Sequence, residues 1–230
     1  MVIFAKSGAG KSVTMKTLIS RSAVLMGIQS LALDAEGEYS IVAESLGGIN
    51  VVLSPTSSTV INIFDLETEI VKDEITGRER LVLNVENKVE DVTQALLTMA
   101  RGSTRSQEVN ELTKQIIAES VSEEYASLGI NGDPNSLYKT SNGSMGGNML
   151  GKEKKEMPTI GSWYRRIQRK AEENKNQDYS FHYSYLLKVM KQYIREYDGQ
   201  MAYFDGQSTF DLLDGTLFIN LDISQLEERF

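Results

Sequence analysis

The chain has 230 residues, of which 40% are hydrophobic and 24% are charged, and its formal net charge is −8. This composition is typical of a globular protein, and the length suits one α/β domain or a domain with a substantial insertion. The absence of cysteine excludes thiol catalysis, disulfides and cysteine-based zinc sites, and the acidic balance argues against a generally basic nucleic-acid-binding surface.

A glycine-containing segment near the N-terminus carries the clearest motif. Residues 5–12 read Ala-Lys-Ser-Gly-Ala-Gly-Lys-Ser, between an apolar run at 2–4 and a helical pattern, which is the context of a phosphate-binding loop. Lys11 would reach the β- and γ-phosphates of ATP, and the Ser12 hydroxyl would ligate Mg²⁺. The usual pattern begins with glycine, where this chain has Ala5; a chance match in a turn is the alternative, and the flanking strand and helix argue against it. The predicted cofactor-binding residues are Ala5, Lys6, Ser7, Gly8, Ala9, Gly10, Lys11, Ser12 and Val13, with ATP and Mg²⁺ as cofactors.

A strand and an acidic segment come next in the chain. The apolar run at 31–33 predicts a strand buried on both faces of a parallel sheet. The carboxylates of Asp34, Glu36 and Glu38 lie just past its end, on the edge where α/β sheets bind ligands. They could position water or Mg²⁺, with Asp34 as the metal candidate, or they are acids that favour the start of a helix predicted over 38–46. The sequence alone leaves both interpretations open.

The remaining pattern predicts a sheet interrupted by a long helical region. A strand is expected at 49–53, and the alternation of strands and helices indicates a parallel sheet with crossover helices. Strand signals are then scarce between about 66 and 200, whereas strand character returns at 216–222. On pattern alone, the carboxylate of Asp222 could hold Mg²⁺ through water, as a strand-end acid does in P-loop ATPases. In the region between, helices are predicted over 85–101, 109–128, 158–174 and 183–197, with a mobile loop at 131–156.

One predicted helix is both basic and aromatic. It carries Arg165, Arg166, Arg169 and Lys170 beside Trp163. Such a surface could contact DNA or a partner subunit, or it could be a solvated face with the tryptophan in the core. The second interpretation is favoured because two glutamates follow and the chain is acidic overall. The single histidine, His182, is expected to have a packing or surface role, since it has no second histidine with which to share a metal.

Six segments together resemble one family. They read AKSGAGKS, LALDAEGEY, INIFDL, PTIGSW, YFDGQSTFDL and LFINLDISQL. Their order is similar to that in the large ATPase of type IV secretion and conjugative-transfer machines, the TraC-like members of the FtsK–HerA group of P-loop motors. The resemblance spans nearly the whole chain, and the acidic segment followed by Ile-Asn-x-Phe-Asp is far more specific than the loop. Family members usually have proline where this chain has Ile63 and often where it has Ala35, differences that affect turn stiffness.

The resemblance implies an α/β fold: a RecA-like P-loop parallel sheet with a large, mostly helical inserted subdomain. The expected boundaries are 1–65 with 203–230 for the core, and 66–202 for the insertion. It also implies a hexameric or other homo-oligomeric form, ATP hydrolysis, and partners among secretion or conjugation channel subunits at the inner face of the membrane. A cytoplasmic location, peripheral at the cytoplasmic membrane, follows from the same resemblance.

The resemblance further changes the interpretation of the strand that ends in Asp222. In the family this strand precedes the Walker B strand, so the chain is expected to be a fragment that starts within its first strand and lacks the Walker B Asp-Glu pair and the arginine finger. Glu36 and Glu38 resemble family positions near the nucleotide and are the candidates for a catalytic role, although neither is assigned as the base.

Three functions are therefore compatible with the sequence. The first is the ATP-binding part of a motor ATPase, and the second is a nucleotide-binding assembly scaffold without turnover. The third, a P-loop kinase, is disfavoured because a long helical insertion follows the third strand. ATP turnover distinguishes the first two.

Overall fold

The computed structural model describes residues 6, 10–54, 57–73, 76–101, 111–139, 153–174, 179–210 and 216–226. The chain separates into two compact units: unit 1 comprises residues 1–59 and 209–230, and unit 2 comprises residues 60–208. The strand predicted at 2–4 lies outside the described residues, as does half of the loop predicted at 131–156, residues 140–152.

A parallel three-stranded sheet forms the centre of unit 1. β5 (Phe218–Asp222) lies between β1 (Ser30–Asp34) and β2 (Ile49–Val52), so a strand from the end of the chain joins the two earlier ones. Asp34 of β1 is in register with Asp222 of β5, which places two carboxylates at the same edge of the sheet. The prediction of an α/β fold with a parallel sheet is confirmed.

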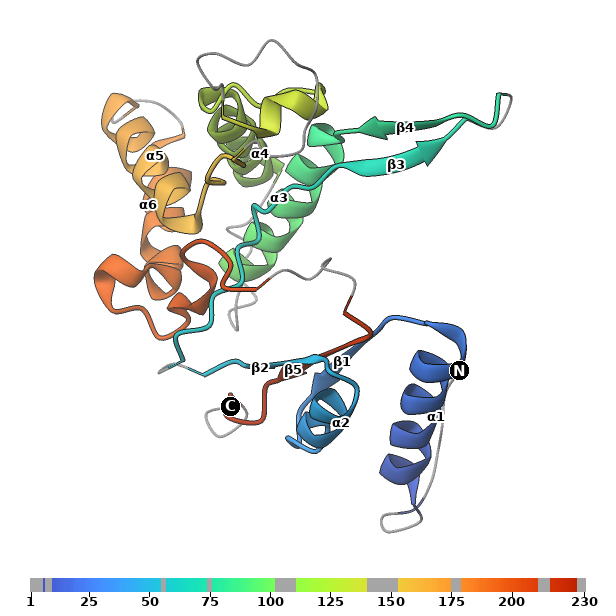
Figure 1. The fold of residues 1–230 in the computed structure, drawn as a ribbon. Coiled ribbons are helices and arrows are strands. Elements are labelled where there is room, and N and C mark those ends of the chain that lie inside the picture. The colour runs from blue at the N-terminus through green and yellow to red at the C-terminus, as the bar shows by residue number, and fades with distance from the viewer. Residues whose placement is uncertain are drawn as a thin grey trace. The chain divides into compact units, whose positions relative to one another are not determined.

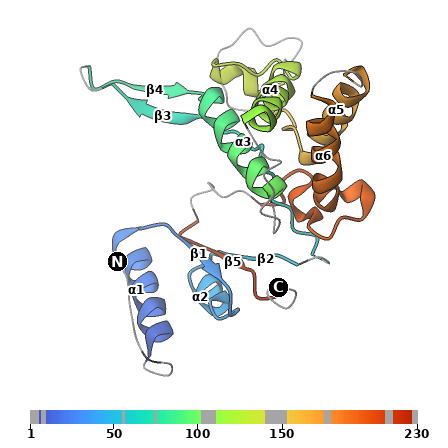
Figure 2. The same cartoon turned by 180° about the vertical axis from the view of Figure 1, so that it is seen from behind.

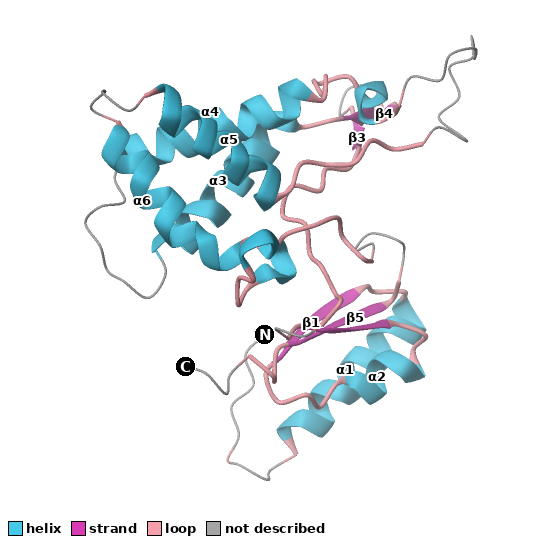
Figure 3. Cartoon of the chain, turned by 90° about the vertical axis from the view of Figure 1, so that its left-hand side faces the viewer, coloured by secondary structure: helices cyan, strands magenta, loops and turns pink. Residues whose placement is uncertain are grey.

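Two helices, α1 (Lys11–Met26) and α2 (Ser40–Ser45), lie on one side of this sheet (Figure 3). A small core of Val42, Ala43 and Phe218 packs between α2 and β5. The helix predicted over 38–46 thus begins two residues later than expected, and the acidic residues precede it.

The burial predicted for β1 is wrong. Leu31 and Leu33 are 63% and 70% exposed, whereas Asp34 is buried. The exposure alternates along the strand because successive side chains point to opposite faces, and Ala32 and Asp34 share the packed face. An all-apolar run therefore cannot by itself distinguish a strand covered on both faces from one covered on a single face.

Four helices in the described part of unit 2 pack around one apolar core (Figure 1). They are α3 (Val85–Arg101), α4 (Glu111–Ser127), α5 (Ile160–Glu173) and α6 (Ser180–Met190). The fully buried side chains include Leu96 of α3, Ile117 of α4, Trp163 of α5 and Leu186 of α6. The predicted helices are confirmed, with one correction: the last begins at Ser180 and gives way after Met190 to short 3₁₀ turns at Lys191–Tyr193 and Arg195–Tyr197.

A β-hairpin in unit 2 was not predicted from the scarce strand signals between 66 and 200. β3 (Glu69–Lys72) pairs with β4 (Glu79–Val82) in antiparallel fashion, and Figures 1 and 2 show the hairpin extending away from the helices of its own unit. Ile70 and Leu81 face each other across it, 68% and 42% exposed. The strands are short and carry charges at most other positions, so they lack the apolar alternation by which strands are recognised.

Further regular structure interrupts the loop predicted at 131–156. Pro134–Leu137 form a 3₁₀ turn, and Tyr138 pairs with Lys154 in an isolated antiparallel bridge. Asp133 caps this turn by accepting from the Asn135 backbone N–H at 2.9 Å.

Three of the segments that carry the family resemblance meet in unit 2. The Asn62 amide donates to the Pro158 carbonyl at 2.9 Å. The Asp205 carboxylate accepts from the backbone N–H of Gly161 at 2.7 Å and from that of Arg195 at 2.9 Å. A Cβ at position 161 would lie 2.7 Å from this carboxylate, so the close approach requires glycine. These motif residues therefore hold the start of α5 against two distant loops.

Candidate nucleotide-binding site

The first turn of α1 presents backbone N–H groups that have no partner within the helix. Gly10 precedes the helix with φ +82°, a left-handed conformation that glycine adopts without strain, and its carbonyl accepts from the Thr14 N–H and hydroxyl at 2.9 and 3.0 Å. No side chain of the described residues caps this end, and no acidic residue occupies the first turn. The positive end of the helix dipole is thus available to an anion.

A cavity of about 550 Å³ adjoins this helix start. Its volume lies within the roughly 300–1,000 Å³ that small-molecule sites occupy. Lys6 and Lys11 line it, and neither makes an ion pair with a residue that the structure describes. The described residues that line it are Lys6, Gly10, Lys11, Ser12, Val13, Leu33, Asp34, Ala35, Glu36, Glu38 and Tyr39. The arrangement joins two unpaired cations and a helix N-terminus to an acidic turn.

Asp34 organises the acidic turn. Its carboxylate is buried and accepts from the backbone N–H of Glu38 at 3.2 Å and of Tyr39 at 2.8 Å. The Asn220 amide of β5 donates to it at 3.2 Å. The side chain thus fixes the chain path between β1 and α2, a structural role that sequence reasoning did not separate from metal binding.

The pKa of Asp34 is lowered from its usual value. Burial acts in the opposite direction, but the hydrogen bonds from the Tyr39 N–H, the Asn220 amide and the Glu38 N–H outweigh it. The pKa of Tyr39 is raised, first by burial and then by the charges of Asp34, Glu38 and Glu36. At neutral pH the cavity therefore combines an ionised Asp34 with a neutral phenol that can donate a hydrogen bond.

The acidic turn is tied to α1. Lys16 lies 3.5 Å from the Glu38 carboxylate and 5.5 Å from the centre of the Tyr39 ring. Each contact is half-exposed and contributes about 1 kcal/mol or less. Sequence reasoning missed Lys16 and Tyr39; their signal is a basic residue one helical turn beyond Ser12 and an aromatic directly after the acidic run.

The predicted site residues fall into three groups. Lys6, Gly10, Lys11, Ser12 and Val13 gather at the cavity with Asp34, Glu36 and Glu38. Ala5, Ser7, Gly8 and Ala9 lie outside the described residues. The third group is Asp222, whose carboxylate accepts from the Ser224 backbone N–H and hydroxyl at 3.0 and 2.6 Å.

The residues at the cavity fit ATP with Mg²⁺. Lys11 and the free N–H groups of α1 match the charge of a triphosphate, and Ser12 supplies a hydroxyl ligand at the same end of the helix. Within the described ranges no cluster of three or more carboxylate or imidazole side chains could hold a metal. A Mg²⁺ bound here would therefore take most of its ligands from phosphate and water, as Mg²⁺ commonly does.

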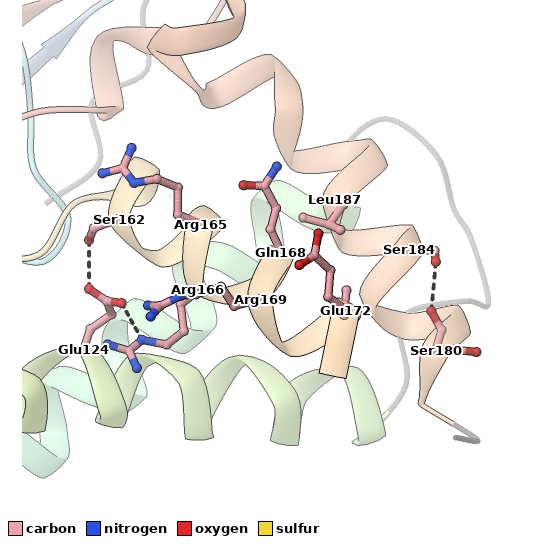
Figure 4. Close-up of a pocket in the computed structure, with 11 residues that line it drawn as sticks. Glu124, Ser162, Arg165, Arg166, Gln168, Arg169, Glu172, Ser180, Ser184 and Leu187 are labelled. Carbon is pink, nitrogen blue, oxygen red and sulfur yellow. Dashed lines mark hydrogen bonds and ion pairs between the residues drawn. The ribbon is translucent and has the colours of Figure 1, made fainter. Parts of the chain in front are cut away.

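A second hollow, of about 1010 Å³, lies along α5 in unit 2. Figure 4 shows that Glu124 of α4 reaches both Ser162 and Arg166 of α5. The other lining residues are Arg165, Gln168, Arg169, Ala171, Glu172, Ser180, Ser184 and Leu187. Arg165, Arg166 and Arg169 of this hollow belong to the basic face of α5, for which the sequence allows contact with DNA or a partner.

Most cations of that face are paired. Arg166 contacts Glu124 at 2.5 Å and Glu123 at 3.5 Å, and Lys170 contacts Glu123 at 2.6 Å. Arg165 has only a distant, exposed contact at 3.7 Å with Glu196. Trp163 is fully buried and donates to the Ser120 hydroxyl at 2.7 Å, and His182 is buried against Thr113 at 3.0 Å. The predicted core position of Trp163 and the packing role of His182 are confirmed.

Replacing Arg166 with alanine is expected to lower the free energy of unfolding of unit 2 by about 3 kcal/mol, since it strands a Glu124 side chain that is only 8% exposed. Arg165→Ala removes the same charge from the same helix, but the contact that it breaks is exposed. Its expected loss in the free energy of unfolding is therefore about 1 kcal/mol or less. Urea denaturation followed by circular dichroism measures both. Equal losses of unfolding free energy in the two variants would contradict a buried ion pair between Arg166 and Glu124.

Comparison with known proteins agrees with this architecture. The sequence matches the family described as the central domain of helicase HerA over residues 1–208. Among solved structures it is similar to VirB4 of Thermoanaerobacter pseudethanolicus, with a TM-score of 0.64 and 22% identity over 98% of this chain. The chain spans 50% of that VirB4 chain. No curated protein shows significant similarity to it.

The family match covers most of the chain, including the helix start with Lys11 and Ser12 and the three motifs that meet around Asp205. The VirB4 likeness extends the same fold to the strand at the end of the chain. The chain therefore belongs to the family of the HerA helicase central domain, in the FtsK–HerA group of P-loop ATPases.

Proposed function

We propose that the chain is the ATP-binding part of a motor ATPase that energises type IV secretion, in particular the conjugative transfer of DNA. The observation that carries this proposal is the cavity at the start of α1, where Lys11 and Ser12 lie beside an uncapped helix N-terminus. Membership of the FtsK–HerA group and the likeness in fold to VirB4 support the motor class.

The proposed roles follow from the chemistry of each side chain. Lys11 contacts the β- and γ-phosphates, Ser12 ligates Mg²⁺, and Lys6 adds positive charge at the rim. Glu36 and Glu38 line the same cavity, and we propose that their carboxylates orient water near the phosphates.

The assembly is proposed from the family alone. We infer a hexameric or other homo-oligomeric form that works with channel subunits at the inner face of the membrane, in the cytoplasm or peripheral to the cytoplasmic membrane. No helix of the described part of the chain has the length and apolar character needed to span a bilayer.

Fewer observations support direct DNA contact through α5. Arg166 and Lys170 are engaged by Glu123 and Glu124, and Arg165 has an exposed contact with Glu196. Among the described residues of this face, Arg169 is left to approach a phosphate backbone, together with Arg165 if its exposed contact opens. The overall charge of −8 opposes such contact elsewhere on the chain.

A measurement of ATP turnover distinguishes a motor ATPase from a nucleotide-binding scaffold. Phosphate release is measured for the purified chain with ATP–Mg, with Lys11→Ala as the matched variant. Hydrolysis above the level of the variant is the result that the motor interpretation predicts. Binding of ATP–Mg without such hydrolysis would instead identify the chain as a nucleotide-binding scaffold and overturn its motor role.

A further inference from the structure

A polar residue sits at the centre of the sheet of unit 1. Asn220 is fully buried in β5, the middle strand, where parallel sheets are otherwise built from apolar side chains. Its register partners are Ala32 on one side and Asn50 on the other. A buried amide in this place needs a reason beyond packing, because an apolar residue of the same size would fill the space at lower cost.

Both amide protons of Asn220 are used. The Nδ2 group donates to Asp34 Oδ2 at 3.2 Å and to Asn50 Oδ1 at 2.8 Å. The carboxylate fixes the orientation of the amide, since the reverse orientation would set two acceptors against each other. Asn220 Oδ1 in turn has no hydrogen-bond partner in the described structure. The Asn220 side chain thus donates both of its N–H groups to the neighbouring strands, while its own oxygen has no donor among the described residues.

The interaction with Asp34 leads to the cavity. The same carboxylate accepts from the backbone N–H of Glu38 and Tyr39, which belong to the turn that lines the cavity together with Lys11. A hydrogen-bonded connection therefore runs from the middle strand through Asp34 to the acidic wall of the site.

We propose that Asn220 is a positioning residue of the nucleotide site: its amide holds the Asp34 carboxylate, which in turn holds residues 35–39 in the shape that receives the nucleotide. This inference rests on the proposed binding of ATP–Mg at the cavity. Asn220 itself does not line the cavity and acts only through Asp34.

The test compares the dissociation constant for ATP–Mg with the stability of the chain. Asn220→Leu keeps the size of the side chain and removes its donors, and we expect it to weaken binding about tenfold, the loss of one hydrogen bond to a charged group. Asn50→Ala removes the other acceptor, and Val51→Ala removes buried packing from the same sheet. Both controls are expected to bind within about twofold of the wild-type chain, even where Val51→Ala melts earlier.

A double-mutant cycle measures the coupling between Asn220 and Asp34 in ATP–Mg binding, which a general loss of stability would not change. If Asn220 acts through Asp34, then Asn220→Leu weakens binding little further in an Asp34→Asn background. Additive losses would overturn the inference, as would binding by Asn220→Leu within twofold of the wild type, or equal weakening by Val51→Ala. Should the leucine variant not fold, Asn220→Ser tests the same point, because its shorter hydroxyl does not reach both partners.

The wild-type chain and Lys11→Ala separate this inference from the proposed function. Binding that depends on Lys11 but not on Asn220 would refute only the positioning role. Absence of ATP–Mg binding by the wild-type chain would refute both.

Discussion

Replacing Lys11 with alanine is expected to abolish the rise in melting temperature that ATP–Mg gives the wild-type chain. Ligand at one hundred times its dissociation constant stabilises a folded protein by about 2.7 kcal/mol, or about 5–10 °C for a chain of this size. Lys11 carries this effect because it begins α1 at the cavity and makes no ion pair with the described residues. Differential scanning fluorimetry with and without ATP–Mg measures the shift.

Arg21→Ala is the matched control. Arg21 is an exposed cation on the same helix and lies away from the cavity, so its removal takes the same charge from the chain. We expect its shift with ATP–Mg to equal that of the wild type. An undiminished shift in Lys11→Ala would contradict the assignment of the site, and loss of the shift in both variants would attribute it to net charge.

Trp163→Ala is expected to produce the largest loss of stability, about 3–5 kcal/mol in unit 2. The side chain is fully buried at the centre of the helical core, and its indole N–H donates to Ser120, which is equally buried. Removing the ring leaves a cavity that the packed helices cannot fill, and it leaves the Ser120 hydroxyl without its donor. Thermal and urea unfolding followed by far-ultraviolet circular dichroism provide the measurement, since the variant has no tryptophan to report fluorescence.

Two controls bracket this result. Trp163→Phe retains most of the buried ring and loses the hydrogen bond, so its expected cost is about 1–2 kcal/mol. Phe181→Ala removes a ring from α6 that is 55% exposed, and about 1 kcal/mol or less is expected. A loss for Trp163→Ala no greater than that for Phe181→Ala would place the tryptophan at a surface and revive α5 as a contact face.

The helices of unit 2 could be predicted because their signals are local. Val92 and Leu96 repeat at helical spacing and are buried in α3 as that spacing requires. Thr159 begins α5 with a reciprocal pair of hydrogen bonds to Ser162, at 3.1 and 2.9 Å, so the start predicted from Pro158-Thr159 was accurate.

What the sequence could not predict depends on distant contacts. Beyond the end of α6 at Met190, the Asp205 carboxylate accepts a hydrogen bond from the Arg195 N–H and so stabilises a non-helical path there. The apolar residues of the β3–β4 hairpin stand in adjacent pairs and do not alternate with polar ones, and its pairing is set by a turn rather than by a buried face. The exposure of Leu31 likewise depends on which elements cover the sheet.

The residues of the candidate site also differ in whether the local sequence identifies them. Lys11 and Ser12 are found by a motif of adjacent residues, and they lie together at the cavity. The role of Asp34 stayed open because its partner Asn220 is 186 positions away in the chain. The one available signal was a lone amide inside an otherwise apolar strand, Phe-Ile-Asn-Leu.

Amide hydrogen exchange of the complete chain, with and without ATP–Mg, tests most directly where the nucleotide binds. The site described above predicts slower exchange at the start of α1, over residues 10–14, and in the acidic turn, over residues 34–39, with no change in the β3–β4 hairpin. Unchanged exchange at both segments, or protection confined to the hollow along α5, would contradict it.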